Sequence, residues 1–208
     1  MKKIAIFGKK GSIAKFDITS NNSIWIGKLE DKYTPSSIAQ INDYLLVYSN
    51  TSFTGKGMIH CFLEDNGKLL WSYETKDICN ASHPFVPLML DNYLYYMPSS
   101  KEVAKLSLNN GELMFRKKFE KSMFKAYGLM IISDSVFLIS KKDALKVNKE
   151  SGDVSPYPKI SESINLKEIS ASLGNGTSYL SSISLAYPQS GDSGMVMTGG
   201  GDAGGGGE

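Results

Sequence analysis

A turn-and-strand motif recurs four times along this chain of 208 residues, and a repeat of this length restricts the fold. Each copy runs from an apolar strand through a polar turn into a second apolar strand. One position of the second strand holds Trp25, Trp71, Phe115 and Pro156, in steps of 46, 44 and 41 residues. Four residues earlier stand Asn21, Gly67, Gly111 and Gly152. Glycine and asparagine accept the positive φ of a tight turn, so turn chemistry and strand pattern agree in every copy.

Each copy also has apolar strands upstream of the motif. One such strand occurs in all four copies, at residues 4–7, 44–48, 93–97 and 136–139. Another precedes it in the last three copies, at 37–40, 85–89 and 127–131, with polar pairs such as Asp91-Asn92 between the two. Four short strands per 41–46 residues are typical of a propeller blade. The sequence therefore predicts an all-β fold, a small β-propeller or propeller-like array of about four to five four-stranded antiparallel blades.

The predicted domain spans residues 1–190, with repeats near 4–28, 44–75, 93–120 and 136–158. The first repeat lacks its first strand, because only three residues precede Ile4. Propellers commonly close by pairing strands from the two chain ends, so we expect a closing segment at 164–188, where 177–180 and 183–187 have strand composition. Residues 162–172 could support one turn of helix. A curved open array is the alternative, which would leave unpaired strand edges.

The C-terminal range 191–208 differs from the rest of the chain in composition. It holds nine of the 20 glycines, three acids and no base. Gly-rich sequences behave as flexible coils, so residues 191–208 are predicted to be a flexible, acidic, Gly-rich tail.

The repeat resembles that of the quinoprotein-type, or pyrroloquinoline-quinone-like, β-propellers. That family's motif runs from an apolar strand through Asp and a Thr-Gly turn to Trp. It is matched by Asp17, Ser20 and Trp25 in the first copy, by Gly67 and Trp71 in the second, by Gly111 in the third and by Gly152 in the fourth. The resemblance covers residues 4–158 and implies a propeller fold, although the family usually closes seven or eight blades. Members that use the cofactor are secreted dehydrogenases with arginine- and tryptophan-lined pockets and bound calcium. Because this chain has one arginine, two tryptophans already placed in the repeat and no Asp-rich calcium loop, no cofactor is expected.

The charge pattern argues against a nucleic-acid partner and a membrane location. Lysine and arginine total 23 against 21 acids, and Arg116 is the single arginine. Lysines occur at most in pairs, such as Lys117-Lys118 and Lys141-Lys142, which favours solubilising surface charges over a concentrated basic patch. No stretch reaches the length of a membrane span or of an export signal, so a cytoplasmic protein with reduced cysteines is expected.

A serine-protease-like tetrapeptide, Gly191-Asp192-Ser193-Gly194, lies in the tail. With His60 upstream and Asp91 or Asp134 between them, it could form the triad of a serine hydrolase. The sequence after Ser193 is short and mostly glycine, and His60 lies within a repeat strand. A chance match in a Gly-rich tail is therefore the favoured interpretation.

A zinc site built from Cys61, Cys79, His60 and His83 is also disfavoured. Structural zinc motifs use short paired spacings such as C-x-x-C, and none occurs here. No catalytic, cofactor-binding or metal-ligating residue is assigned.

The function favoured by the sequence is a non-catalytic, protein-binding propeller. Its partner surface could lie at the loops Lys32–Pro35 and Ser82–Phe85, which carry exposed-type aromatic and proline residues. By analogy, an immunity- or antitoxin-type protein that neutralises a bacterial toxin by binding it is the preferred role. A serine hydrolase using Ser193 and a quinone-dependent oxidoreductase fragment remain the alternatives.

Overall fold

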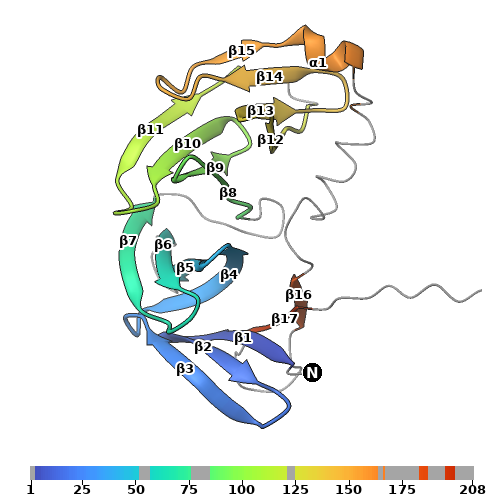
Figure 1. Cartoon of the computed structure of the whole chain (residues 1–208). Helices are drawn as coiled ribbons and strands as arrows, with labels where there is room; N and C mark the ends of the chain where they lie inside the picture. Colours follow the sequence, from blue (N-terminus) through green and yellow to red (C-terminus); the bar gives the residue numbers. More distant parts are fainter. Residues whose placement is uncertain are drawn as a thin grey trace, which may run out of the picture.

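Four antiparallel sheets follow one another along the chain and stand side by side in an arc (Figure 1). The computed structural model describes residues 3–51, 57–75, 85–120, 125–163, 166, 183–186 and 195–199. Each sheet is called a blade and numbered in chain order. Apart from one short helix, the regular elements of these residues are strands. The protein is thus an all-β, propeller-like array of antiparallel blades, which confirms the predicted fold class.

Blades 2, 3 and 4 each contain four strands in simple up-and-down order. Blade 2 consists of β4 (Tyr33–Ile41), β5 (Tyr44–Thr51), β6 (Gly57–Leu63) and β7 (Leu69–Thr75). Blade 3 consists of β8 (Leu88–Leu90), β9 (Tyr93–Ser99), β10 (Glu102–Ser107) and β11 (Leu113–Lys118). Blade 4 consists of β12 (Gly128–Ile132), β13 (Ser135–Ile139), β14 (Ala144–Val147) and β15 (Val154–Pro156), and the helix α1 (Pro158–Ser163) follows it.

Blade 1 combines strands from distant parts of the chain. It contains β1 (Ile4–Lys9), β2 (Ser12–Asp17) and β3 (Asn22–Lys28), and β17 (Met195–Gly199) pairs antiparallel with β1. β16 (Ile183–Ala186) pairs with the other edge of β17. The segment 164–188, in which the closing strand was expected, contains β16, whereas the strand beside β1 comes from the Gly-rich range 191–208. Residues 195–198 are the β-prone run of that range. The division into a domain of 1–190 and a tail stays a prediction.

The aromatic and glycine positions of the repeat join neighbouring blades. Three pairs make the three junctions: Trp25 with Gly67, Trp71 with Gly111, and Phe115 with Gly152. A Cβ atom at Gly111 or Gly152 would stand 2.5 Å from the facing ring, so only glycine permits the contact. These glycines also have φ between 68° and 75°, a conformation that glycine adopts without strain.

Hydrogen bonds across the junctions follow the same repeat. The indole Nε1 of Trp25 donates to the Glu64 carbonyl (2.9 Å), and that of Trp71 donates to the Leu108 carbonyl (2.6 Å). Phe115 has no such donor. At its junction the Nζ of Lys105 donates instead to the carbonyl of Lys149, at 2.7 Å, which is the repeat equivalent of the other two acceptors.

Lys105 is held in an aromatic setting. Its Nζ lies 3.8 Å from the centroid of the Tyr93 ring, and the residue is only 5% exposed. Burial lowers the pKa of Lys105. The lysine therefore supplies the hydrogen bond that the tryptophans supply at the other two junctions, although this partly buries an ammonium group.

The hydrophobic core is divided among these junctions. One apolar cluster lies between each pair of consecutive blades. A fourth cluster lies on the far side of blade 4, where Ile160 and Leu166 pack with Phe137, Ile139 and Ala144. The segment containing α1 therefore covers the face of blade 4 that a following blade would otherwise occupy. In the described part of the chain, no helix is long and apolar enough to cross a bilayer.

Candidate functional site

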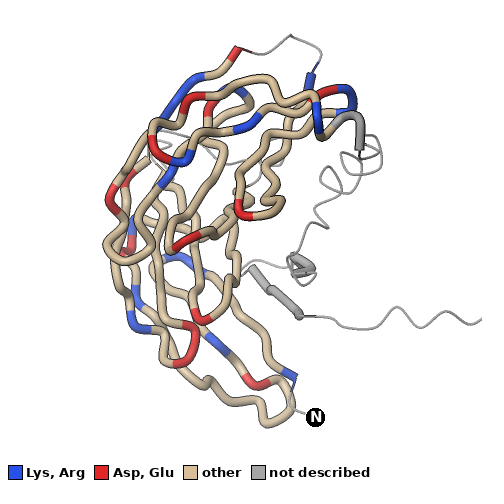
Figure 2. Tube along the Cα trace, turned by 45° about the horizontal axis from the view of Figure 1, so that its top comes forward, with Lys and Arg blue, Asp and Glu red and all other residues tan. Residues whose placement is uncertain are grey.

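The hairpin turns carry opposite charges at the two faces of the array. Because successive strands are antiparallel, the turns between first and second strands lie at one face and those between second and third strands at the other. The first set holds an acid in blades 2, 3 and 4: Asp43, Asp91 and Asp134. The second set holds lysines in blades 1, 3 and 4: Lys9-Lys10, Lys101 and Lys141-Lys142. We call the latter the lysine face; charged segments line the turns of the arc (Figure 2).

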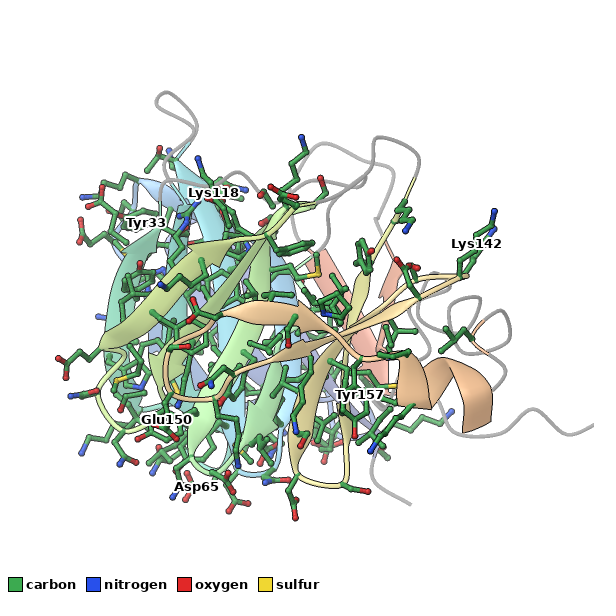
Figure 3. The ribbon with its side chains drawn as sticks, turned by 90° about the horizontal axis from the view of Figure 1, so that it is seen from above. Tyr33, Asp65, Lys118, Lys142, Glu150 and Tyr157 are labelled. Carbon is green, nitrogen blue, oxygen red and sulfur yellow. The ribbon has the colours of Figure 1, made fainter. Side chains whose placement is uncertain are left out.

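A cleft of about 970 Å³ lies between blades 3 and 4. Three lysines from the lysine-face ends of the strands line it, namely Lys101, Lys118 and Lys125. Apolar side chains of β14 and β15, Leu145 and Val154, form another part of its wall. Figure 3 shows Lys118 at the edge of the array opposite to Asp65 and Glu150.

Phe119 anchors the blade 3 side of this cleft. It follows β11 directly, and its backbone N–H donates to the carbonyl of Lys101 at 3.0 Å, which extends the pairing of β10 and β11 by one step. Its ring is buried and meets the ring of Tyr127 edge to face, with centroids 5.7 Å apart. Aromatic pairs of this geometry are favourable beyond their buried area. The pair holds the two walls of the cleft together.

Asp143 organises the blade 4 side. Its carboxylate accepts hydrogen bonds from Lys125 Nζ (2.5 Å), from Tyr127 Oη (3.0 Å) and from Ser140 Oγ. Burial opposes ionisation of Asp143, but these three donors together outweigh it and lower the pKa of the carboxyl. Burial and the bond to Asp143 raise the pKa of Tyr127 to about 12. At neutral pH Asp143 is therefore a carboxylate and Tyr127 a neutral phenol.

Two lysines of the cleft have no carboxylate at ion-pair distance within the described residues, Lys101 and Lys118. The neighbouring Lys117 does pair, with Asp153 at 3.4 Å, and Lys125 pairs with Asp143. Both Lys101 and Lys118 are exposed. Of the carboxylates that also line the cleft, Asp143 and Asp153 are paired with Lys125 and Lys117, and Glu120 is exposed. The two ammonium groups beside an aromatic and aliphatic wall suit an acidic group with an apolar neighbour.

This cleft is not visible in the charge pattern when the pattern is followed along the chain. There the pairs Lys117-Lys118 and Lys141-Lys142 look like separate solubilising charges. One feature of the sequence could have indicated the lysine face. Lysine recurs at the turn between the second and third strands of the repeat, and aspartate recurs at the turn between the first and second strands. Aligned by the repeat, that pattern indicates that lysines gather at one face, where Asp143 and Glu120 also lie beside the cleft.

His60, the candidate base of the hydrolase hypothesis, is 3% exposed on β6. Its Nε2 lies 2.8 Å from Ser49 Oγ and its Nδ1 lies 2.8 Å from Ser72 Oγ, so hydroxyls occupy both ring nitrogens. Burial lowers the pKa of His60 to about 4. Within the described residues His60 binds no carboxylate.

The two candidate aspartates of that hypothesis lie in turns of blades 3 and 4 and not beside His60. Asp91 lies in the turn between β8 and β9 and pairs with Lys149 Nζ at 2.8 Å. Asp134 lies in the turn between β12 and β13. Ser193 falls outside the described residues. The His60 site therefore has the geometry of a buried structural histidine.

Of the four residues of the zinc hypothesis, the structure describes His60 and Cys61. Cys61 is fully buried on β6, and burial raises the pKa of its thiol to about 12. Cys79 and His83 lie outside the described residues. Across the described ranges no group of three His, Cys, Asp or Glu side chains is placed to hold a metal ion.

Two aromatic residues of the loops expected to bind a partner, Tyr33 and Phe85, are buried in the core. Tyr33 begins β4 and is 5% exposed, with its ring edge to face against His60 at a centroid distance of 5.5 Å. Phe85 is buried between Tyr48 and Tyr96.

The arginine and tryptophans named in the cofactor argument are also committed to structural contacts. Arg116 binds Glu102 at 2.6 Å, and the two indoles join the blades.

No known family model and no curated protein sequence matches this chain. Among solved structures it is similar to BamB from Moraxella catarrhalis, with 15% identity and a TM-score of 0.49 over 73% of this chain and 48% of BamB. It is also similar to the quinohemoprotein alcohol dehydrogenase ADHIIG from Pseudomonas putida HK5, with 11% identity and a TM-score of 0.46 over 71% of this chain and 31% of that one. The computationally designed protein Ika8 aligns at 13% identity and a TM-score of 0.48, over 94% of this chain and 55% of its own. The chain thus spans about half the length of BamB and under a third of the dehydrogenase.

Proposed function

We propose that this chain is a non-catalytic, protein-binding module that takes an acidic segment of another protein into the cleft between blades 3 and 4. The observation that supports this most directly is the pair Lys101 and Lys118, which have no carboxylate at ion-pair distance in the described residues. An acidic partner satisfies both ammonium groups. The Phe119 and Tyr127 rings and the aliphatic wall then provide the apolar contact that gives such an interface its affinity.

The charge arrangement of the whole face supports the same partner chemistry. Lys9, Lys10, Lys141 and Lys142 lie at the same face as the cleft. Lysines of this kind accelerate association with an acidic surface and make it dependent on ionic strength, whereas they contribute less to the final affinity. Lysine side chains, unlike arginine, suit a surface that must remain hydrated until the partner arrives.

The test compares three full-length baits on extracts of the source cells: the natural chain, the charge reversal Lys101→Glu/Lys118→Glu, and the control Lys3→Glu/Lys68→Glu. Both double variants change the net charge by the same amount, but Lys3 and Lys68 are exposed at the opposite face. The proposal expects a protein retained by the natural chain and the control and lost by the cleft variant. The purified partner should then bind in calorimetry with affinity that falls as salt is raised.

Equal capture by all three baits would contradict the proposed site. Turnover of an ester or alcohol substrate by the purified chain would contradict the non-catalytic role.

The finer proposal is that the partner is a bacterial toxin domain and the chain its immunity- or antitoxin-type inhibitor. It rests on the analogy drawn from the sequence, a short chain without a complete catalytic motif. Co-expression with the product of the adjacent gene tests it. We expect the natural chain and the control to rescue growth and the variant Lys101→Glu/Lys118→Glu to fail. Rescue by all three chains, or by none of them, would count against the proposal.

A further inference from the structure

Within the described residues, one face of blade 1 has no blade packed on it. In blades 2, 3 and 4 the equivalent face packs against the blade that precedes it in the chain. Position by position, Phe16 of blade 1 is equivalent to Phe62, Leu106 and Val147, which are all fully buried against the blade before them. Phe7 is equivalent to Val47, Tyr96 and Leu138, which are buried at the same junctions. Phe7 and Phe16 pack edge to face with centroids 5.7 Å apart, but both remain partly exposed.

The opposite side of blade 1 is the one that meets blade 2. A Cβ atom at Gly8 would point at Pro35 of β4, and Ile6, two residues earlier, belongs to the cluster between blades 1 and 2. Successive residues of a strand point to opposite sides. Phe7 therefore points away from blade 2, and its cross-strand partner Ala14 points the same way.

An unusual isoleucine extends this face. Ile26 on β3 is opposite Ala14 and is 63% exposed. The equivalent residues of blades 2 and 3 are Ser72 and Arg116, which are polar. Blade 1 thus has an apolar residue where blades 2 and 3 have a polar one, whereas the equivalent residue of blade 4 is Tyr157, which packs against the apolar cluster on the far side of that blade. An exposed isoleucine at position 26 is expected where another protein surface packs on this face.

Another repeat-type blade does not fit on this face. Each junction requires an aromatic ring against a turn glycine, and the turn of blade 1 has Asn21, at φ 56°, in the glycine position. A Cβ atom there occupies the place of the ring. Nor can blade 4 of a second molecule supply the contact, because the α1 segment covers its outer face and Pro156 replaces the aromatic residue. Head-to-tail stacking of chains is therefore excluded.

We infer that a second copy of this chain covers the face, with blade 1 packed on blade 1 across a two-fold axis. A self-complementary apolar patch is the basis of such an isologous contact. The five strands of blade 1 hold between four and seven residues each. At about 3.3 Å per residue and about 4.8 Å between strands they give a face of roughly 440 Å² per copy, or about 900 Å² in all. That lies just below the ~1,000 Å² at which stable specific interfaces begin, so the expected dimer is a weak one.

Charge fixes how the two copies are oriented. Lys9 and Lys28 both pair with Ser12 and so stand together at one end of the face. A parallel arrangement would bring the lysines of the two copies together. The antiparallel arrangement, in which the lysine end of one copy meets the Asn21 turn of the other, separates them, so the dimer takes the antiparallel form.

Sedimentation velocity of the full chain between 1 and 100 µM tests the inference. The natural chain should form a concentration-dependent dimer. Ile26→Arg should weaken dimerisation at least tenfold, and Arg116 shows that the equivalent position of another blade accepts arginine. Ile24→Arg, at a 47% exposed position of the same strand, is the second variant and should act in the same direction.

Met114→Arg is the matched control, because Met114 is 48% exposed at the position of blade 3 equivalent to Ile24. It should dimerise as the natural chain does. The inference is overturned if the natural chain is monomeric at 100 µM, as expected if another segment of the same chain covers the face. It is also overturned if Ile26→Arg and Ile24→Arg, with unchanged circular dichroism, dimerise normally. Neither result bears on the cleft between blades 3 and 4.

Discussion

Replacing Lys105 by methionine should destabilise the protein by removing the hydrogen bond that joins blades 3 and 4. A hydrogen bond from a charged donor contributes about 1.5–3 kcal/mol. The contact of the ammonium with the Tyr93 ring, at 3.8 Å, adds about 0.5–2 kcal/mol. Methionine keeps the apolar stem and ends the unfavourable burial of the charge, which offsets part of the loss. We expect Lys105→Met to lower the free energy of unfolding by about 2 kcal/mol.

The informative variant is the double substitution Lys105→Met/Phe115→Trp. Trp25 and Trp71 show that an indole at this repeat position donates to the facing carbonyl at 2.9 and 2.6 Å. An indole at position 115 should reach the Lys149 carbonyl once the ammonium no longer occupies it. The double variant should therefore recover about 1 kcal/mol, the typical worth of a neutral hydrogen bond.

Urea unfolding, followed by tryptophan fluorescence and circular dichroism for all four members of the cycle, measures the coupling between the two positions. For a protein of this size, about 1 kcal/mol corresponds to roughly 2–4 °C in Tm. A loss in Lys105→Met smaller than about 0.5 kcal/mol, the least that a single hydrogen bond typically contributes, would refute the reasoning. So would the absence of any recovery when Phe115→Trp is added.

Other buried groups lead to three more predictions. His60 has its pKa lowered to about 4 from 6.5 by burial, so the unfolded chain binds a proton that the folded chain does not between these values. Stability should therefore fall by about 3 kcal/mol as the pH drops from 7 to 4, and urea unfolding of His60→Gln should lose this part of the pH dependence. Gly111→Ala should cost about 3 kcal/mol in thermal unfolding, because its Cβ would stand 2.5 Å from the Trp71 ring. Gly11→Ala has a similar φ, and its Cβ would meet the Asp31 Oδ1 at 2.7 Å and the Asp31 Cα at 3.4 Å. It should cost less, because the Asp31 carboxylate can move aside; equal costs would contradict the ring contact. Asp143→Asn should lower the pKa of Tyr127 from about 12, although burial should keep it above 10. NMR of labelled tyrosine measures this pKa. An unchanged value would show that the bond to Asp143 does not raise the pKa of Tyr127.

The fold could be predicted because its junctions depend on residues that the repeat displays directly. A ring at one position and a glycine four residues earlier are visible in the sequence, and their contact explains both. The hairpin turns were equally accessible, since Asn42, Asn92 and Asp134 all adopt the positive φ that their residue types tolerate. These features are local, so the chain order of residues was enough.

The cleft and the donor role of Lys105 could not be predicted in the same way. Lys101 and Lys125 are 24 positions apart and meet only because blades 3 and 4 stand side by side. Lys105 looks like any strand lysine until Phe115 is seen to lack a donor. The strand β17 was missed because glycine dominates the composition around its few β-prone residues. In each case the decisive partner is distant in sequence.

The positions that join the blades carry different residues at the outer faces of blades 1 and 4. Asn21 keeps the left-handed turn, at φ 56°, but adds the Cβ atom that a facing ring excludes. Pro156 removes the ring at the other end, and α1 begins two residues later and brings Ile160 onto blade 4. A closed ring would need an aromatic residue at 156 and a glycine at 21, because each contact requires both partners. Since both are replaced and the segment carrying α1 packs on the far face of blade 4, blade 4 and blade 1 do not offer each other the ring-and-glycine contact that joins the other blades.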